Sequence, residues 1–125
     1  MKILICGSRV WYDRRPIENF ILQCIREAKY RGEKLIIVHG NARGADKIAD
    51  QLAKKYGILL QCKSAEWERY GGQAGIIRNE QILDEHSDIT RVYAFKVGER
   101  SIGTGDMIQR ARDQTIPVLI RHERK

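Results

Sequence analysis

The chain has 125 residues, a length that supports one domain with an ordinary hydrophobic core. Its composition, 42% hydrophobic and 31% charged, excludes a disordered tail, a collagen-like repeat and a disulfide scaffold. The net charge of +7 makes nucleic acid or a phosphorylated ligand the first class of partner to consider. Residues 1–62 carry most of this excess, with 12 basic and 6 acidic side chains against 11 and 10 in residues 63–125.

The N-terminus and the cysteines predict a cytoplasmic protein that does not associate with membranes. Only four apolar residues, Ile3–Cys6, precede Gly7, and no run approaches the roughly 20 residues of a membrane span. The cysteines Cys6, Cys24 and Cys62 each lie in an apolar run, which predicts buried free thiols. Because no Cys/His ligand spacing exists, we expect no metal site.

Short apolar runs alternate with helical stripes along the chain. In chain order, the first predicted elements are a strand at Lys2–Cys6, a helix from about Pro16 to Gly32, a strand at Lys34–His39, a helix from Ala45 to Gly57 and a strand at Ile58–Cys62. They are followed by a helix at Ala74–Glu85, a strand at Arg91–Phe95, a helix at Thr104–Gln114 and a strand at Pro117–Ile120. The strand runs are mostly β-branched, as strands buried on both faces are. This alternation predicts an α/β fold with helices on both faces of a five-stranded, mostly parallel sheet.

Two segments fall outside these elements. Lys63–Gly75 is the longest predicted non-helical stretch, and loops of this length in compact domains are more often functional than idle. Residues 1–120 are expected to form a single domain, with Arg121–Lys125 as a loose basic tail.

Three glycine-containing turns follow predicted strands, at the sheet edge where α/β proteins bind ligands. They are Gly7-Ser8-Arg9, His39-Gly40-Asn41-Ala42-Arg43-Gly44-Ala45-Asp46 and Ser101-Ile102-Gly103-Thr104-Gly105-Asp106. Glycine lets the backbone approach an anion, and the free amides and dipole of a helix N-terminus attract it. The turns therefore predict a phosphate site, although a tight turn without a ligand would also use glycine. Neither the Walker pattern nor the dinucleotide fingerprint is complete.

Several side chains beside these turns are candidates for binding. Arg9, Arg43 and Arg78 are the predicted phosphate ligands, because a guanidinium holds two phosphate oxygens at once; the alternative is that each is a surface arginine. Trp67 either stacks on a base or covers the edge of the core. His39, at the end of a buried strand, is expected to be structural.

Two aspartates near the predicted helix starts complete the candidates. Asp46 and Asp106 are expected in first helical turns, where a carboxylate caps the helix. Alternatively, either one contacts a ribose hydroxyl or acts as an acid or base.

Together these segments resemble the YspA-like branch of the SLOG superfamily. The matching residues are Gly7-Ser8-Arg9 with Asp13, His39-Gly40-x-Ala42-Arg43-Gly44-Ala45-Asp46, Ala65-x-Trp67, Gly72-x-Ala74-Gly75-x-x-Arg78-Asn79 and Gly103-Thr104-x-Asp106-Met107. They span nearly the whole chain in the family's order. The resemblance implies a Rossmann-like three-layer α/β/α fold and self-association as a homodimer.

The superfamily includes cytokinin-activating phosphoribohydrolases, the DNA-processing protein DprA and proposed sensors of nucleotide-derived signals. The leading expectation is therefore binding of a nucleotide or nucleotide-derived ligand, without a further cofactor. The expected ligand-binding residues are Gly7, Ser8, Arg9, Gly40, Arg43, Gly44, Asp46, Trp67, Arg78, Asn79, Gly103, Thr104 and Gly105.

A nucleotide N-glycosidase is the enzymatic alternative, with Asp106 and Arg78 as the catalytic residues. The phosphoribohydrolases use an arginine and a P-G-G-x-G-T-x-x-E stretch, and Arg78 and Gly103-Thr104 match parts of this pattern. Ser101-Ile102 replaces two of its glycines, no proline precedes them, and Asp106-Met107 stands where the acid is expected. The catalytic motif is thus incomplete.

Nucleic-acid binding, by analogy with DprA, is the less favoured partner class. Its basic residues lie mostly on predicted outer helix faces, without the interleaved aromatic residues that stack single strands. They are Arg14, Arg15, Arg26, Lys29, Arg31, Lys47, Lys54 and Lys55. The total charge thus describes a solvated surface, whereas the arginines beside the glycine turns favour a small phosphorylated ligand.

Overall fold

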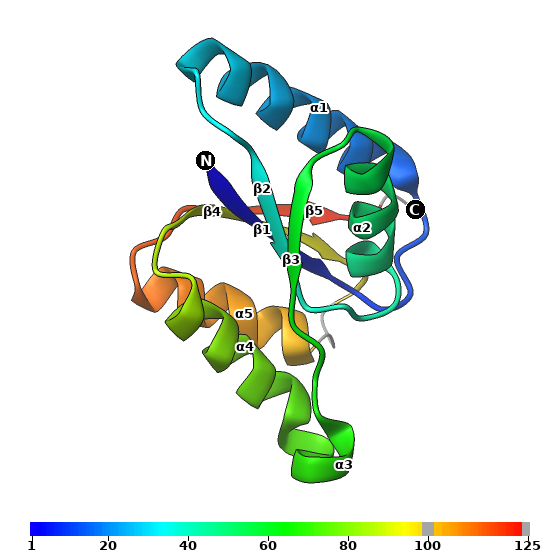
Figure 1. Ribbon diagram of the computed structural model, residues 1–125. Helices are drawn as coiled ribbons and strands as arrows, with labels where there is room; N and C mark the ends of the chain where they lie inside the picture. The colour runs from blue at the N-terminus through cyan, green and yellow to red at the C-terminus, as the bar shows by residue number, and fades with distance from the viewer. Residues whose placement is uncertain (99–101, 124–125) are drawn as a thin grey trace.

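The predicted strands form one parallel sheet in the computed structural model, which describes residues 1–98 and 102–123 (Figure 1). Its order is β3-β2-β1-β4-β5. The strands are β1 (Lys2–Gly7), β2 (Ile36–His39), β3 (Leu59–Cys62), β4 (Ile89–Lys96) and β5 (Val118–His122). From β1 the chain adds β2 and β3 on one side of the sheet, and β4 and β5 then follow on the other side of β1. This reversal is the topological switch point of a Rossmann-like sheet, so the predicted fold class is confirmed.

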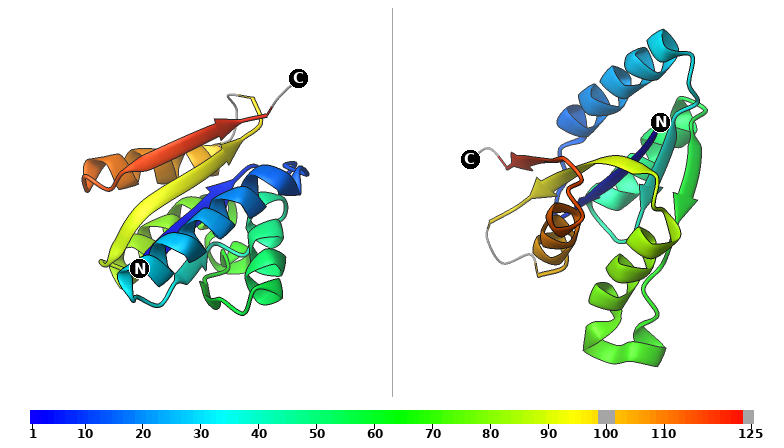
Figure 2. Two further views of the ribbon diagram at one scale, coloured as in Figure 1. Left: turned by 90° about the horizontal axis from the view of Figure 1, so that it is seen from above. Right: turned by 90° about the vertical axis from the view of Figure 1, so that its left-hand side faces the viewer.

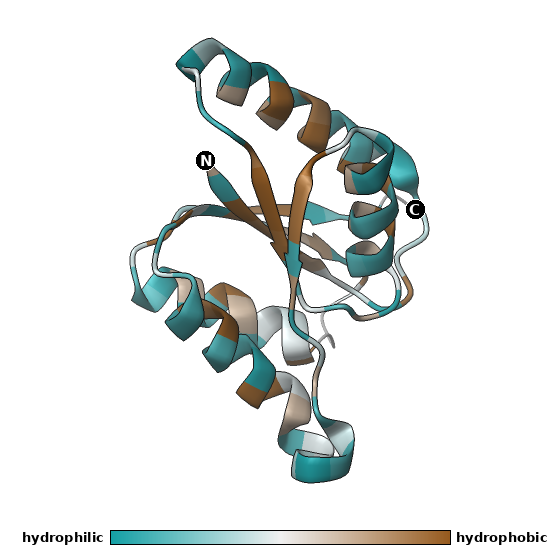
Figure 3. Ribbon diagram, in the orientation of Figure 1, coloured by the Kyte–Doolittle hydropathy of each residue, from teal (hydrophilic) through white to brown (hydrophobic). Residues whose placement is uncertain are grey.

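Helices cover both faces of the sheet and complete the three layers (Figure 2). On one face lie α1 (Arg14–Arg31) and α2 (Ala45–Lys55), and on the other lie α4 (Ala74–Glu85) and α5 (Ile102–Asp113). Successive side chains of β1 point to opposite faces. Ile3 and Ile5 pack in the apolar cluster under α1 and α2, whereas Leu4 packs in the cluster under α4 and α5. Figure 3 shows the apolar strands between helices whose outer faces are hydrophilic.

Local chemistry explains where α1 begins and ends. Asp13 caps its first turn, since its carboxylate accepts a hydrogen bond from the backbone N–H of Arg15 at 3.1 Å. The helix consequently starts two residues before Pro16. Gly32 ends it in the left-handed conformation, with φ of 68°.

Two segments, besides small shifts at the ends of several helices and strands, differ from the sequence prediction. The stretch Lys63–Gly75 is not continuously irregular, because it contains the single helical turn α3 (Trp67–Tyr70) and the 3₁₀ turn η1 (Gly71–Gln73). Strand β5 runs to His122, where it pairs with Lys96 of β4, so the segment expected to be a tail begins inside the sheet. Residues 124–125 of that segment lie outside the described residues.

The prediction that all three cysteines are buried is wrong for Cys62, which lies at the edge of the sheet. Cys6 and Cys24 are buried, and burial raises the pKa of the Cys24 thiol to about 11. Cys62 is exposed, because β3 is an edge strand that is mostly accessible. None of the helices that the structure describes is long and apolar enough to cross a membrane.

Candidate functional site

A cleft of about 450 Å³ opens at the carboxyl ends of β1 and β4, at the switch point of the sheet. Its lining residues are Cys6, Gly7, Ser8, Arg9, Ala42, Asp46, Trp67, Gly72, Gly75, Ile76, Arg78, Asn79, Val97, Ile102, Gly103 and Thr104. A second hollow, of about 500 Å³, lies along α1 beside Tyr93 and Arg121. Apart from Asp13, its lining shares no residue with the glycine motifs, so the cleft is the candidate site.

Two glycines let the first and second turns pack directly against each other. At Gly7, a Cβ atom would lie 2.5 Å from the carbonyl oxygen of Phe95. Gly44 has φ of +74°, and a Cβ there would collide with the carbonyl oxygen of Ser8 and with the backbone of Arg9. The contact also includes a hydrogen bond from the N–H of Ala45 to the Ser8 carbonyl, at 3.2 Å. These glycines therefore shape the end of the cleft, although Gly44 itself does not line it.

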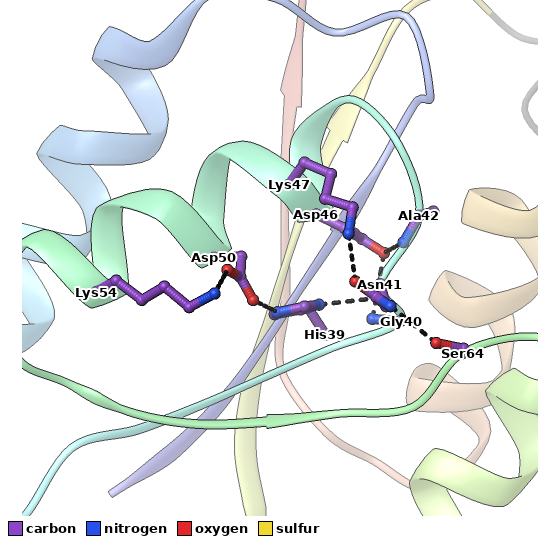
Figure 4. Close-up of polar contacts among 9 residues, drawn as sticks. All are labelled: His39, Gly40, Asn41, Ala42, Asp46, Lys47, Asp50, Lys54 and Ser64. Atoms are coloured by element: carbon purple, nitrogen blue, oxygen red, sulfur yellow. Dashed lines mark hydrogen bonds and ion pairs between the residues drawn. The ribbon is translucent and has the colours of Figure 1, made fainter.

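Asp46 is the buried carboxylate of the cleft, with 3% of its surface exposed. Its Oδ2 atom accepts hydrogen bonds from the backbone N–H groups of Gly40, at 3.2 Å, and Ala42, at 3.1 Å (Figure 4). Its Oδ1 atom is also buried and has no hydrogen-bond partner among the described residues. Burial raises the pKa of Asp46, and the Ala42 hydrogen bond opposes this shift. Asp46 lies in the first turn of α2, but it holds the preceding loop instead of capping its own helix.

His39 holds the same loop through a hydrogen bond to Asn41 and is structural, as expected. It is fully buried, its Nε2 atom lies 2.8 Å from Oδ2 of Asp50, and its Nδ1 atom accepts the N–H of Asn41 at 2.9 Å. Figure 4 shows these contacts beside the loop, where Lys47 also donates to the Asn41 side chain at 2.6 Å. Asn41 has a positive φ of 54°, a conformation that these bonds fix.

Arg78, on α4, holds the opposite side of Gly40. Its Nη1 atom donates to the Gly40 carbonyl at 2.8 Å, and its Nε atom donates to Oδ1 of Asn79 at 3.2 Å. Because Gly40 has no Cβ, the guanidinium can lie against it; a Cβ would be 2.7 Å from Cζ of Arg78. Nη2 has no hydrogen-bond partner in the described part of the chain, so it is available to a ligand. Burial lowers the pKa of Arg78, which stays charged at neutral pH as arginines do.

Arg9 and Trp67 lie together in the lining of the cleft. The guanidinium carbon of Arg9 is 4.9 Å from the centre of the Trp67 ring, the geometry of a cation–π contact. Trp67 is 46% exposed and α3 contains no buried residue, so this tryptophan does not cover the edge of the core.

Asn79 links the arginine side of the cleft to the first turn of α5. Its Nδ2 atom donates to the Gly103 carbonyl at 2.9 Å and to Oδ2 of Asp106 at 3.1 Å. The same Asp106 oxygen accepts from Nε of Arg110 at 2.9 Å. Asp106 lies in the second turn, because α5 begins at Ile102 and not at Thr104 as predicted. It does not line the cleft, and its acid or base role stays a prediction.

The cleft brings together most of the predicted ligand-binding residues. Those lining it are Gly7, Ser8, Arg9, Asp46, Trp67, Arg78, Asn79, Gly103 and Thr104. The predicted residues outside the lining are Gly40, Arg43, Gly44 and Gly105. Arg43 is exposed, and Ser101 of the third turn lies outside the described residues. Lining residues that prediction missed include Cys6, Ile76 and Val97, because apolar side chains in a sequence carry no signal that separates a cleft from a core; Ile102, within the third turn, also lines the cleft.

The sequence is similar to a known protein family and to a known phage protein. The sequence model of the family described as "YspA, cpYpsA-related SLOG family" matches residues 1–70, which contain the first two glycine turns. The Gene 61 protein of Mycobacterium phage D29 is 35% identical over 123 residues, and the alignment covers 94% of each chain. The chain therefore belongs to the YspA, cpYpsA-related SLOG family.

Proposed function

We propose that the protein binds a nucleotide or nucleotide-derived phosphorylated ligand in the cleft at the switch point. The observation that carries this proposal is the convergence of two arginines, a helix N-terminus and an accessible tryptophan in one cleft. The volume of about 450 Å³ falls within the range of roughly 300–1,000 Å³ that is typical of small-molecule sites.

The phosphate is assigned to the first turn of α5 and to the nearby arginines. The first N–H groups of a helix lack intrahelical acceptors, and the helix dipole attracts an anion to them. Gly103 and Thr104 of this turn line the cleft together with Arg9 and Arg78. The free Nη2 atom of Arg78 adds a charged donor, and hydrogen bonds of this kind are worth roughly 1.5–3 kcal/mol each.

The base is assigned to Trp67. Its ring is half-exposed, and a base would stack on it in the place that the Arg9 guanidinium occupies, which frees Arg9 for the phosphate. Base–aromatic stacking contributes about 1–3 kcal/mol.

Binding is better supported than hydrolysis of the glycosidic bond. The carboxylate expected to act in an N-glycosidase, Asp106, is engaged by Asn79 and Arg110 and does not line the cleft. Binding is also better supported than recognition of a nucleic-acid polymer, because the converging groups surround a volume suited to one small ligand.

Calorimetric titration and thermal-shift measurements with nucleoside mono- and diphosphates, cyclic nucleotides and dinucleotides test the proposal. At least one compound should bind, and Arg78→Ala should weaken it by roughly 10- to 100-fold. The matched control is Arg112→Ala, which removes the same charge from an exposed position in the last turn of α5. Arg43→Ala tests the sequence-based assignment of that residue, and its exposed position predicts little effect. If no phosphorylated nucleoside stabilises or binds the wild-type protein, the proposed function is wrong.

A further inference from the structure

Oδ1 of Asp46 is a buried polar atom in the cleft that has no hydrogen-bond partner in the described part of the chain. The residue as a whole is 3% exposed. Leaving such an atom unsatisfied destabilises the fold, so nearly all buried polar side-chain atoms in proteins have a partner. Asp46 lines the cleft, so a ligand group that reached Oδ1 from there would supply the partner that this atom lacks.

None of the described donors near Asp46 bonds to Oδ1, and that includes Nη2 of Arg78. The N–H groups of Gly40 and Ala42 both bond to Oδ2. Arg78, whose charge acts on Asp46, directs Nη1 to the Gly40 carbonyl and Nε to Asn79. These bonds hold the carboxyl group in one orientation. The group is therefore fixed in place before a ligand arrives, with one oxygen committed to the loop and the other unpaired.

The chemistry of a buried carboxyl group restricts what can bind to Oδ1. An ionised phosphate oxygen is only an acceptor and is repelled by a carboxylate. A hydroxyl group fits both protonation states, because it donates to a carboxylate and accepts from a carboxylic acid. This versatility matters here, since burial raises the pKa of Asp46. In a nucleotide the hydroxyl groups belong to the sugar, so a nucleotide bound through Oδ1 would place its sugar toward Asp46 and its phosphate toward α5.

We propose that Oδ1 of Asp46 binds a sugar hydroxyl of the ligand, so that the cleft selects ribonucleotides over deoxyribonucleotides. This inference rests on the proposed function and adds the specificity of the site to it. A site that hydrogen-bonds a substrate hydroxyl discriminates strongly against the analogue that lacks it, because its own buried group then stays unpaired.

The test is a thermodynamic cycle in which the Asp46→Asn substitution in the protein is combined with removal of one hydroxyl group from the ligand. The probes are the four ribonucleoside 5′-monophosphates, their 2′-deoxy and 3′-deoxy counterparts, ribose 5-phosphate and 2-deoxyribose 5-phosphate. Dissociation constants are measured by calorimetry for wild type, Asp46→Asn and the control Asp84→Asn, an exposed aspartate on α4. In Asp46→Asn the amide oxygen still accepts the loop N–H groups, so the loop should keep its conformation.

Wild type should bind a ribose probe roughly 10- to 100-fold more tightly than at least one matching deoxy probe. Asp46→Asn should reduce this ratio to a few-fold, since a neutral amide replaces the carboxyl group, and should leave binding of the deoxy probe unchanged. Asp84→Asn should retain the wild-type ratio.

Three results would overturn the inference. Equal binding of ribose and deoxy probes by wild type means that water satisfies Oδ1; the proposed function then stands and the specificity fails. An equal loss for both probe types in Asp46→Asn means that Asp46 only shapes the loop. Absence of binding by every probe in this set and in the wider nucleotide screen removes the proposed function and this inference together. Equal binding of ribose and deoxy probes by wild type overturns the inference even if Asp46→Asn does not fold.

Discussion

The contact between Gly40 and Arg78 makes Gly40→Ala a sharp test of the site's architecture. A Cβ on Gly40 would lie 2.7 Å from Cζ, 2.8 Å from Nη1 and 2.9 Å from Nε of Arg78. These distances are too short for van der Waals contact, so one partner must move. The guanidinium ends a flexible side chain, whereas the Gly40 backbone is held by Asp46. We therefore expect Arg78 to be displaced while the fold is kept.

The size of the effect follows from the bonds that displacement breaks. Arg78 would lose its bonds to the Gly40 carbonyl, at 2.8 Å, and to Asn79, at 3.2 Å. Bonds to a charged group are worth roughly 1.5–3 kcal/mol each, but the displaced guanidinium regains water. Alanine also stabilises by about 0.4–1 kcal/mol through the unfolded chain. The expected net loss is about 1–2 kcal/mol, or roughly 3–10 °C in Tm.

Thermal and urea unfolding of Gly40→Ala, Arg78→Ala and the double variant measure this effect without a ligand. In the double variant the methyl group has no guanidinium to displace, so the Gly40→Ala substitution should cost nothing further. The matched control is Gly105→Ala, where a Cβ meets nothing within 4 Å and alanine favours the helix. Fully additive losses in the double variant would refute the displacement of Arg78 by the methyl group.

Three further predictions follow from other contacts. Gly44→Ala combines φ of +74° with a collision against Ser8, so it should destabilise by more than about 2 kcal/mol or prevent folding, as judged by circular dichroism and Tm; a near-native Tm would contradict this. Glu27 accepts two hydrogen bonds from Arg91, at 2.7 and 2.9 Å, which lower its pKa from the ordinary 4.5. The stability that this pair provides is therefore present above pH 4.5 and is lost as the pH falls below it. The free energy of unfolding, measured with urea, should fall more steeply on acidification in wild type than in Glu27→Gln. Parallel pH profiles of the two proteins would exclude the effect. The family resemblance predicts a homodimer, and light scattering that returns 14.5 kDa at all concentrations tested would rule it out.

The fold was predictable because the pattern of an apolar strand followed by an amphipathic helix occurs several times along the chain. Each β-branched run followed by a helical stripe independently indicates a βαβ unit, and short errors at the ends do not change the topology. Single-turn elements carry no such repetition. α3 has four residues, too few to show a helical period, so it was indistinguishable from a loop. The exposure of Cys62 depends on β3 being at the sheet edge, which the residues of β3 alone do not encode.

The site was predictable in its segments but not in the direction of its side chains. Arg43 and Arg78 both accompany glycine motifs, yet only Arg78 lines the cleft. The orientation of Arg43 depends on positive φ angles at Asn41 and Gly44, and Gly44 packs against Ser8, which is distant in sequence. The position of Asp106 likewise depends on the helix start at Ile102. The free oxygen of Asp46 could not be foreseen, because an unpaired atom is defined by all of its neighbours in space.

The consecutive residues Arg78 and Asn79 have one more consequence. Their side chains hold two carbonyl oxygens, that of Gly40 beyond β2 and that of Gly103 at the start of α5. One turn of α4 thus sets the distance between two walls of the cleft that come from opposite sides of the switch point. If this cleft binds a nucleotide as proposed, its preorganisation leaves little to be ordered on binding. Weakening either hydrogen bond should then raise the dissociation rate more than it lowers the association rate.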